Sequence, residues 1–88
     1  MKYLRKLTPT ERERFYIKID SEHRSMFPKM NVQFNLIVKE QAFEVRIDRQ
    51  KRLWGYKFRS LIDFSSESVL EITKEEYDVY HLTQIKQK

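Results

Sequence analysis

The chain of 88 residues contains no cysteine, one glycine and two histidines, and each shortage excludes a class of chemistry. Without cysteine there is no disulfide and no thiolate ligand, and two histidines alone give no zinc-binding spacing. One glycine cannot supply a P-loop or a dinucleotide-binding loop. No serine lies in a nucleophile elbow of the G-x-S-x-G type. We therefore expect no catalytic residues, no metal and no cofactor, in a protein that is not an enzyme by itself.

Long apolar runs are also missing. No stretch approaches the length of a membrane span, and the N-terminus lacks the apolar core of a signal peptide. The lack of cysteine fits a reducing compartment. We expect an intracellular protein, in the cytoplasm and nucleoid or in the nucleus, without a membrane partner. The length predicts one domain with a small core, and we expect a monomer while leaving an oligomer open.

The formal net charge is +5, and its distribution is uneven. Residues 1–14 carry +3 and residues 45–59 carry +5, whereas residues 60–80 carry −5. A molecule with a basic front and an acidic rear would be oriented by the field of a polyanion. Residues 46–59 contain six cations and one anion, together with the only Trp and the only Gly. Cations, amides and flat rings at a hairpin tip suit a partner with phosphates and base edges.

Alternating apolar residues predict a mainly β fold with one or two short helices, closed or nearly closed into a small pseudobarrel of six or seven strands. The expected strands lie at 15–19, 34–38, 43–47, 56–59, 70–72 and 77–82, with 33–48 as an antiparallel hairpin. The expected breaks lie at 40–41, 65–68 and 73–76, and a frayed tail is expected at 83–88. We divide the chain into a basic N-terminal segment with a short helix (1–14), a β-pseudobarrel DNA-binding domain (15–82) and a C-terminal tail (83–88).

Two helical turns are indicated by capping residues. Thr8, Pro9 and Glu11 form a helix start, with Thr8 as N-cap, proline at the first helical position and glutamate three residues after the cap. Ser21 is a candidate cap for a second turn, which Pro28 prevents from extending.

Several single residues carry expectations of their own. Met26 and Phe27 are expected in the core, and Trp54 is expected to be partly buried. Gly55 is expected to allow a bulge or a positive φ. His23 could contact phosphate or a base edge from its loop, or it could be idle in a loop that closes one mouth of the barrel.

The order of these features resembles the B3-like DNA-binding pseudobarrel. That family includes plant B3 transcription-factor domains and the effector or target-recognition domains of some type II restriction endonucleases. The resemblance rests on the strand 15–19, the loop 21–28, the hairpin 34–48, the basic arm 49–56, the segment 58–64 and the strands 69–72 and 77–80. The sequence departs from the family at Ser66-Glu67-Ser68, where such domains usually carry Gly-Asp.

The resemblance implies sequence-specific binding of double-stranded DNA by two arms in the major groove. It assigns the first arm to Ser21, Glu22, His23 and Arg24. It assigns the second arm to Arg49, Gln50, Lys51, Arg52, Trp54 and Tyr56. Candidate clamps on the DNA backbone are Lys18, Arg46, Lys57 and Arg59. The roles implied are transcription regulation or the recognition part of a restriction-modification enzyme whose catalytic domain lies elsewhere.

Three alternatives remain open on the sequence. An OB-like barrel would bind single-stranded DNA or RNA by stacking bases on Tyr16, Trp54 and Tyr56. A protein-interaction β-barrel adaptor would present an aromatic face of Trp54, Tyr56, Tyr77 and Tyr80. A fragment of a metal-dependent nuclease would use the carboxylates of Glu67, Glu71, Glu75 and Asp78.

Overall fold

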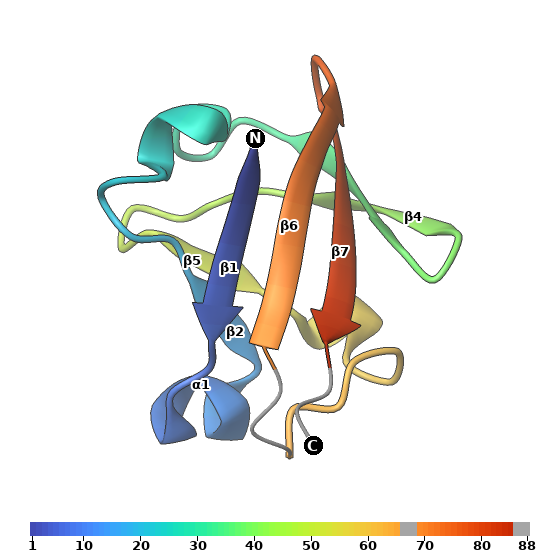
Figure 1. The fold of residues 1–88 in the computed structure, drawn as a ribbon. Coiled ribbons are helices and arrows are strands. Elements are labelled where there is room, and N and C mark those ends of the chain that lie inside the picture. The colour runs from blue at the N-terminus through green and yellow to red at the C-terminus, as the bar shows by residue number, and fades with distance from the viewer. Residues whose placement is uncertain (66–68, 86–88) are drawn as a thin grey trace.

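The computed structural model describes residues 1–65 and 69–85, and it confirms a mainly β fold with little helix (Figure 1). Within these residues, seven strands form a five-stranded sheet of order β1-β6-β7-β3-β4 and a two-stranded ribbon of β2 and β5. The two sheets are not joined into one continuous sheet, so the pseudobarrel is nearly closed and not fully closed. The strands are β1 (Lys2–Lys6), β2 (Tyr16–Lys18), β3 (Phe34–Val38), β4 (Gln41–Val45), β5 (Arg52–Trp54), β6 (Val69–Glu76) and β7 (Val79–Ile85). The helical segments are α1 (Pro9–Arg14) and the 3₁₀ turns η1 (Arg24–Met26) and η2 (Tyr56–Phe58).

The core lies between the ribbon and the five-stranded sheet. Ile17 and Leu53 fill it from the ribbon, while Leu36 and Tyr80 fill it from the sheet, each at most 1% exposed. The β3–β4 hairpin is confirmed, and the side chains that alternation places inward on β3 are buried. Met26 and Phe27 also belong to the core, as expected. Because both sheets share these side chains, the position of the ribbon is tied to that of the larger sheet.

Strand β1 was not expected from the sequence. It pairs antiparallel with β6, with Tyr3 opposite Ile72, so the basic N-terminal segment supplies an outer strand of the five-stranded sheet. Tyr3 is fully buried, but Leu4 points outward and is 54% exposed. An apolar residue on the solvent face obscures the alternation by which a strand is recognised.

Helix α1 begins as the sequence predicts. Thr8 is the N-cap: its hydroxyl accepts from the Glu11 N–H at 3.2 Å, and the Glu11 carboxylate accepts from the Thr8 N–H at 3.1 Å. This reciprocal pair is a capping box. The helix ends at Phe15, whose left-handed φ of 61° turns the chain into β2. The left-handed Phe15 therefore marks the change from α1 to β2, which starts at Tyr16.

Glu11 has a second role besides capping the helix. It is the one charged residue that is buried among the described residues, with 1% of its surface exposed. Its carboxylate also accepts from Arg5 Nη2 at 2.7 Å and from the Lys18 N–H at 2.8 Å. Burial alone would raise the pKa of Glu11, but the hydrogen bonds from Arg5, Lys18 and Thr8 outweigh it and lower the pKa. One carboxylate thus joins β1, α1 and β2.

Removing this charge should weaken the fold. Glu11→Gln keeps the size of the side chain but leaves Arg5 without its partner, so we expect the free energy of unfolding at pH 7 to fall by about 3 kcal/mol. Urea unfolding measures it, with Glu13→Gln on the exposed side of α1 as a control expected within about 0.5 kcal/mol of the parent. Equal stability of Glu11→Gln and the parent would contradict the structural role of Glu11.

The same group predicts a dependence on pH. Since folding lowers the pKa of Glu11, its ionised form stabilises the fold above the unfolded pKa of about 4.3. That contribution is lost as the pH falls through the lower, folded-state pKa. Below pH 4 the parent should therefore lose its advantage over Glu11→Gln.

The far ends of β6 and β7 differ from expectation. The turn expected at 73–76 is wrong: β6 continues to Glu76, and the chain reverses at Tyr77 and Asp78. The strand expected at 77–82 runs instead from Val79 to Ile85, so part of the expected frayed tail is strand. The expected turn at 65–68 lies partly outside the described residues, as does the end of the tail. Residues 74–78 are all exposed, so no inward alternation marks this part of the hairpin.

The segment after β5 also corrects the sequence analysis. Residues 56–58 form the 3₁₀ turn η2 and not a strand. Gly55 has a φ of −104°, so the expected positive φ is wrong. Instead, a Cβ on Gly55 would lie 2.8 Å from Phe64 Cζ and 3.2 Å from the Phe15 carbonyl oxygen. Close packing explains the glycine.

A side chain at this position should strain the core. We expect Gly55→Ala to lower the free energy of unfolding by about 1–3 kcal/mol, because the added methyl overpacks against Phe64. Urea unfolding of Gly55→Ala, Phe64→Leu and the double variant forms a cycle in which the smaller Leu should recover part of the loss. Full stability of Gly55→Ala would show that the contact does not require glycine.

No helix among the described residues is long and apolar enough to cross a membrane.

Candidate nucleic-acid interface

The outer face of the β2–β5 ribbon gathers rings and cations. The antiparallel register places Tyr16 opposite Trp54 and Lys18 opposite Arg52, while Ile17, one position along, faces the core. Directly paired residues lie on the same face of a sheet. The four outer positions of the ribbon are therefore two aromatic and two cationic side chains, side by side.

The loop between β4 and β5 continues this face. A bridge between Ile47 and Leu53 aligns the two segments, and residues 48–52 make the turn. Asp48 fixes the loop: one oxygen of its carboxylate, Oδ1, accepts from the Gln50 and Arg52 N–H groups, each at 2.9 Å. Lys51 then takes a left-handed φ of 64°, which is typical of a three-residue hairpin loop. We call residues 48–52 the basic loop.

Asp48 also orients the only tryptophan. The other oxygen of its carboxylate, Oδ2, accepts from the Trp54 indole N–H at 2.8 Å. Burial opposes the ionisation of Asp48, but the hydrogen bonds from Arg52, Trp54 and Gln50 outweigh it and lower its pKa. Trp54 is partly buried, as expected, and the Arg52 guanidinium lies 5.0 Å from the Tyr16 ring centre and 5.8 Å from that of Trp54. The cation is held against two rings.

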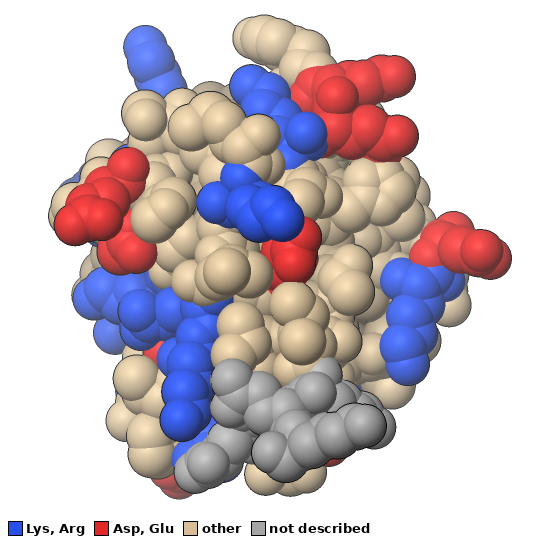
Figure 2. All heavy atoms as spheres, in the orientation of Figure 1, with Lys and Arg blue, Asp and Glu red and all other residues tan. Residues whose placement is uncertain are grey.

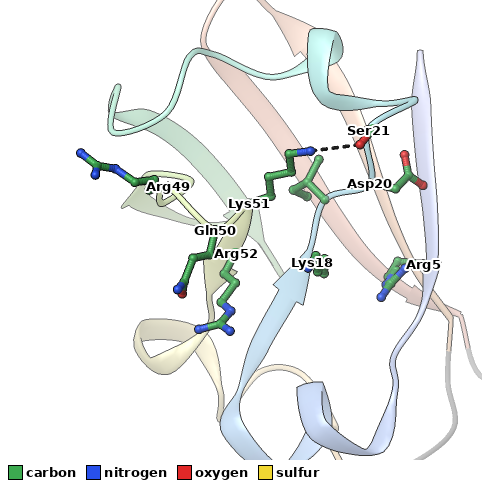
Figure 3. A pocket seen from close by; sticks show the side chains of 9 residues that line it. Arg5, Lys18, Asp20, Ser21, Arg49, Gln50, Lys51 and Arg52 are labelled. Carbon is green, nitrogen blue, oxygen red and sulfur yellow. Dashed lines mark hydrogen bonds between the residues drawn. The ribbon is translucent and has the colours of Figure 1, made fainter.

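The two predicted arms meet at the edge of the ribbon. Lys51 Nζ donates to Ser21 Oγ at 3.0 Å, and the Ile19 N–H donates to the Lys51 carbonyl at 2.8 Å (Figure 3). Ser21 was expected to cap a helical turn, but η1 has no side-chain cap. Asp20 instead closes the turn before η1: its Oδ1 accepts from the His23 N–H and lies 2.8 Å from His23 Nδ1. The pKa of Asp20 is lowered chiefly by its hydrogen bond with His23. Ser21 is thereby available to Lys51.

Between the arms lies a shallow groove of about 630 Å³, which we call the basic groove. Five of its lining residues are cations and one is an acid. The lining residues are Arg5, Lys18, Ile19, Asp20, Ser21, Arg49, Gln50, Lys51 and Arg52. Figure 3 shows Arg49 and Gln50 extending outward from the basic loop. The groove thus combines exposed hydrogen-bonding groups with a positive field.

The other predicted site residues lie elsewhere. Arg46, Trp54, Tyr56 and Lys57 line a second groove of about 460 Å³, which we call the aromatic groove, together with Gln33, Glu44 and Val45. Arg24 donates to the Pro28 carbonyl at 2.5 Å and lines neither of these grooves.

The remaining three predicted residues line neither groove. His23 packs against Tyr3, with ring centres 4.9 Å apart. Arg59 lies over the Phe15 ring at 5.5 Å, and Glu22 is exposed.

Sequence analysis missed Arg5 and Asp20 in the lining of the basic groove. Arg5 gave no signal because β1 was not recognised as a strand. Asp20 lies two residues after the end of β2. An aspartate side chain often accepts a hydrogen bond from a backbone N–H a few residues further along the chain, and this tendency could have identified Asp20.

The surface carries local clusters of charge of each sign. Figure 2 shows Lys and Arg atoms gathered at the lower left, towards β1 and α1, and a cluster of Asp and Glu atoms at the upper right, over the end of the β6–β7 hairpin. Within residues 1–65 and 69–85, no three His, Asp or Glu side chains lie close enough to hold a metal ion. Glu67, part of the nuclease alternative, lies outside these residues. In the adaptor alternative, Tyr80 is 1% exposed and donates to the Met26 carbonyl, so it cannot belong to an exposed aromatic face.

Comparison with known proteins gives a fold relationship. No family model matches the chain, and no curated protein matches it. The solved structure of the N-terminal domain of Helicobacter pylori LlaJI.R1 is similar, with a TM-score of 0.76 and 19% identity, covering 98% of this chain and 88% of that chain. At this identity the likeness shows a shared fold.

The arrangement predicts a structural role for Asp48. In Asp48→Asn, an NH₂ group replaces one of the two carboxylate oxygens. That group cannot accept a hydrogen bond, so it would leave either the backbone N–H donors or the Trp54 indole N–H without an acceptor. We expect the free energy of unfolding to fall by about 1–2 kcal/mol and the Trp54 emission to shift to longer wavelength as the indole gains contact with water. Urea unfolding and fluorescence measure both, with the exposed Asp78→Asn as control. Unchanged stability and emission would contradict this role.

Proposed function

We propose that this chain is a DNA-recognition domain that binds double-stranded DNA through the basic groove, without catalysing a reaction by itself. The observation that carries the proposal is the Lys51–Ser21 hydrogen bond, which joins two segments 30 residues apart into one cationic surface. Lysine and arginine side chains around such a groove can neutralise phosphates, and this supplies most of the affinity of non-specific DNA binding.

The lining also supports readout of sequence. Arg49 and Gln50 are exposed at the tip of the basic loop, whose backbone is fixed by Asp48. Arginine can bond guanine bidentately, and glutamine can do the same with adenine. A fixed backbone reduces the entropy lost when these side chains bind. We assign base readout to Arg49 and Gln50, and phosphate contact to Lys18 and Lys51.

The structural neighbour adds support at the level of class. LlaJI.R1 is a restriction-related protein, and its N-terminal domain has this fold. A recognition domain belonging to a restriction system, with catalysis on another domain, fits that relationship. The finer proposal is a B3-like domain that reads a specific site with two arms in the major groove.

A titration of labelled duplex tests the proposal. We expect Lys51→Gln to weaken duplex binding and to reduce the slope of log K against log salt by about 1, because one phosphate contact is lost. Arg49→Gln should cost about 1–3 kcal/mol at the preferred site and relax specificity there. Fluorescence anisotropy at several salt concentrations measures both effects.

A matched control removes the same charge elsewhere. Lys74, on the exposed part of β6, lines neither the basic nor the aromatic groove, so Lys74→Gln should bind duplex like the parent. Absence of duplex binding at low salt, or equal losses in Lys51→Gln and Lys74→Gln, would overturn the proposal.

A further inference from the structure

The aromatic groove lies beside the basic groove but shares none of its lining residues. Its walls come from four places in the chain: Gln33 before β3, residues 44–46 at the end of β4, Trp54 of β5 and the first residues of η2. Its volume of about 460 Å³ lies in the range of small-ligand sites. The proposed duplex contacts make no use of it.

Two rings form a platform in this groove. The Trp54 and Tyr56 rings are nearly parallel and stacked, with an angle of 8° between their planes and 5.7 Å between their centres. The hydrogen bond from Trp54 to Asp48 fixes one ring, and an edge contact from Phe15 at 5.8 Å supports the other. Tyr56 nevertheless remains 55% exposed. A fixed, exposed ring is the surface on which a flat heterocycle stacks with little loss of entropy.

The polar groups around the platform favour an anion attached to that heterocycle. Lys57 Nζ donates to the Glu44 carbonyl at 2.9 Å, which leaves two of its N–H groups available. Arg46 contacts the Gln33 side-chain oxygen at 3.4 Å. Among the described residues, neither cation lies within 4.0 Å of a carboxylate in an ion pair. Glu44 is the acidic residue in the lining of the aromatic groove. Its carboxylate can accept a hydrogen bond from an exocyclic amine of a base, but it repels a phosphate.

We propose that the aromatic groove binds an unpaired deoxynucleotide, with its base stacked on Tyr56 and its phosphate between Arg46 and Lys57. A base pair inside a duplex has both faces covered by its neighbours, so a base must leave the helical stack to lie on Tyr56. The site therefore takes single-stranded DNA or an unpaired extension of a duplex. The choice of DNA rests on the proposed function, but the site uses different residues and can be tested separately.

The test compares two labelled probes, a 12-nucleotide single strand and a blunt duplex of the same sequence. Tyr56→Ala should weaken single-strand binding about ten-fold, as expected for the loss of one stacked base, and should leave duplex affinity within about two-fold. Tyr56→Phe keeps the ring and should bind the single strand like the parent. Because Trp54 is the only tryptophan, its emission should change when the single strand binds.

Two controls separate the grooves. Tyr77→Ala removes a tyrosine that is 90% exposed and lines neither groove, and it should leave both affinities unchanged. Arg49→Gln should weaken duplex binding while single-strand affinity stays within about two-fold. A circular dichroism spectrum of each variant establishes that it is folded.

The outcomes distinguish this inference from the proposed function. Single-strand affinity that is unaffected by Tyr56→Ala, or that falls as much in Arg49→Gln as in Tyr56→Ala, would overturn the aromatic groove as a site. Duplex binding without single-strand binding would overturn it too, while leaving the proposed function standing. Single-strand binding that depends on Tyr56, without duplex binding, would support the inference and refute the proposed function.

Discussion

The buried carboxylate of Glu11 is the constraint on which the ribbon depends. It accepts hydrogen bonds from the side chain of β1, the cap of α1 and the backbone of β2, through Arg5, Thr8 and Lys18. A buried charge is tolerated only where its partners are all in place, so the carboxylate requires these three segments to converge. Since β2 pairs with β5, the position of Glu11 also determines where the basic loop is presented.

Asp48 has a similar role at the surface of the ribbon. Its two oxygens are engaged by two backbone N–H groups and by the Trp54 indole. The carboxylates of Glu11 and Asp48 are thus hydrogen-bonded within the protein, whereas the Arg49 side chain of the basic loop is exposed to solvent. Glu11 and Asp48 hold the backbone of the ribbon in place, while Arg49 and Lys51 have no ion pair with a carboxylate among the described residues. The fold thus maintains a positive surface at the basic loop while its two nearby carboxylates stabilise the backbone.

Local signals in the sequence predicted the parts of the fold that local physics determines. The β3–β4 hairpin follows from alternation, and the start of α1 follows from its capping box. Strand β1 and the turn at 77–78 were not predicted, because their exposed positions break the alternation of apolar and polar residues. The basic loop was recognisable from its composition, but its junction with Ser21 and its separation from the aromatic groove depend on the register between β2 and β5, which pairs residues about 35 positions apart. No local pattern encodes that register.

The ribbon also explains how one fold can be kept while its chemistry changes. Its inner positions Ile17 and Leu53 must be apolar, because both are fully buried in the core. Among the outer positions, Lys18 is exposed and its side chain can vary at a small cost in stability, whereas Trp54 is held by its hydrogen bond to Asp48. A neighbour with 19% identity can therefore share this fold. Under the proposed function, specificity is decided at the exposed outer positions and on the basic loop, whereas the core determines only that they are held in place.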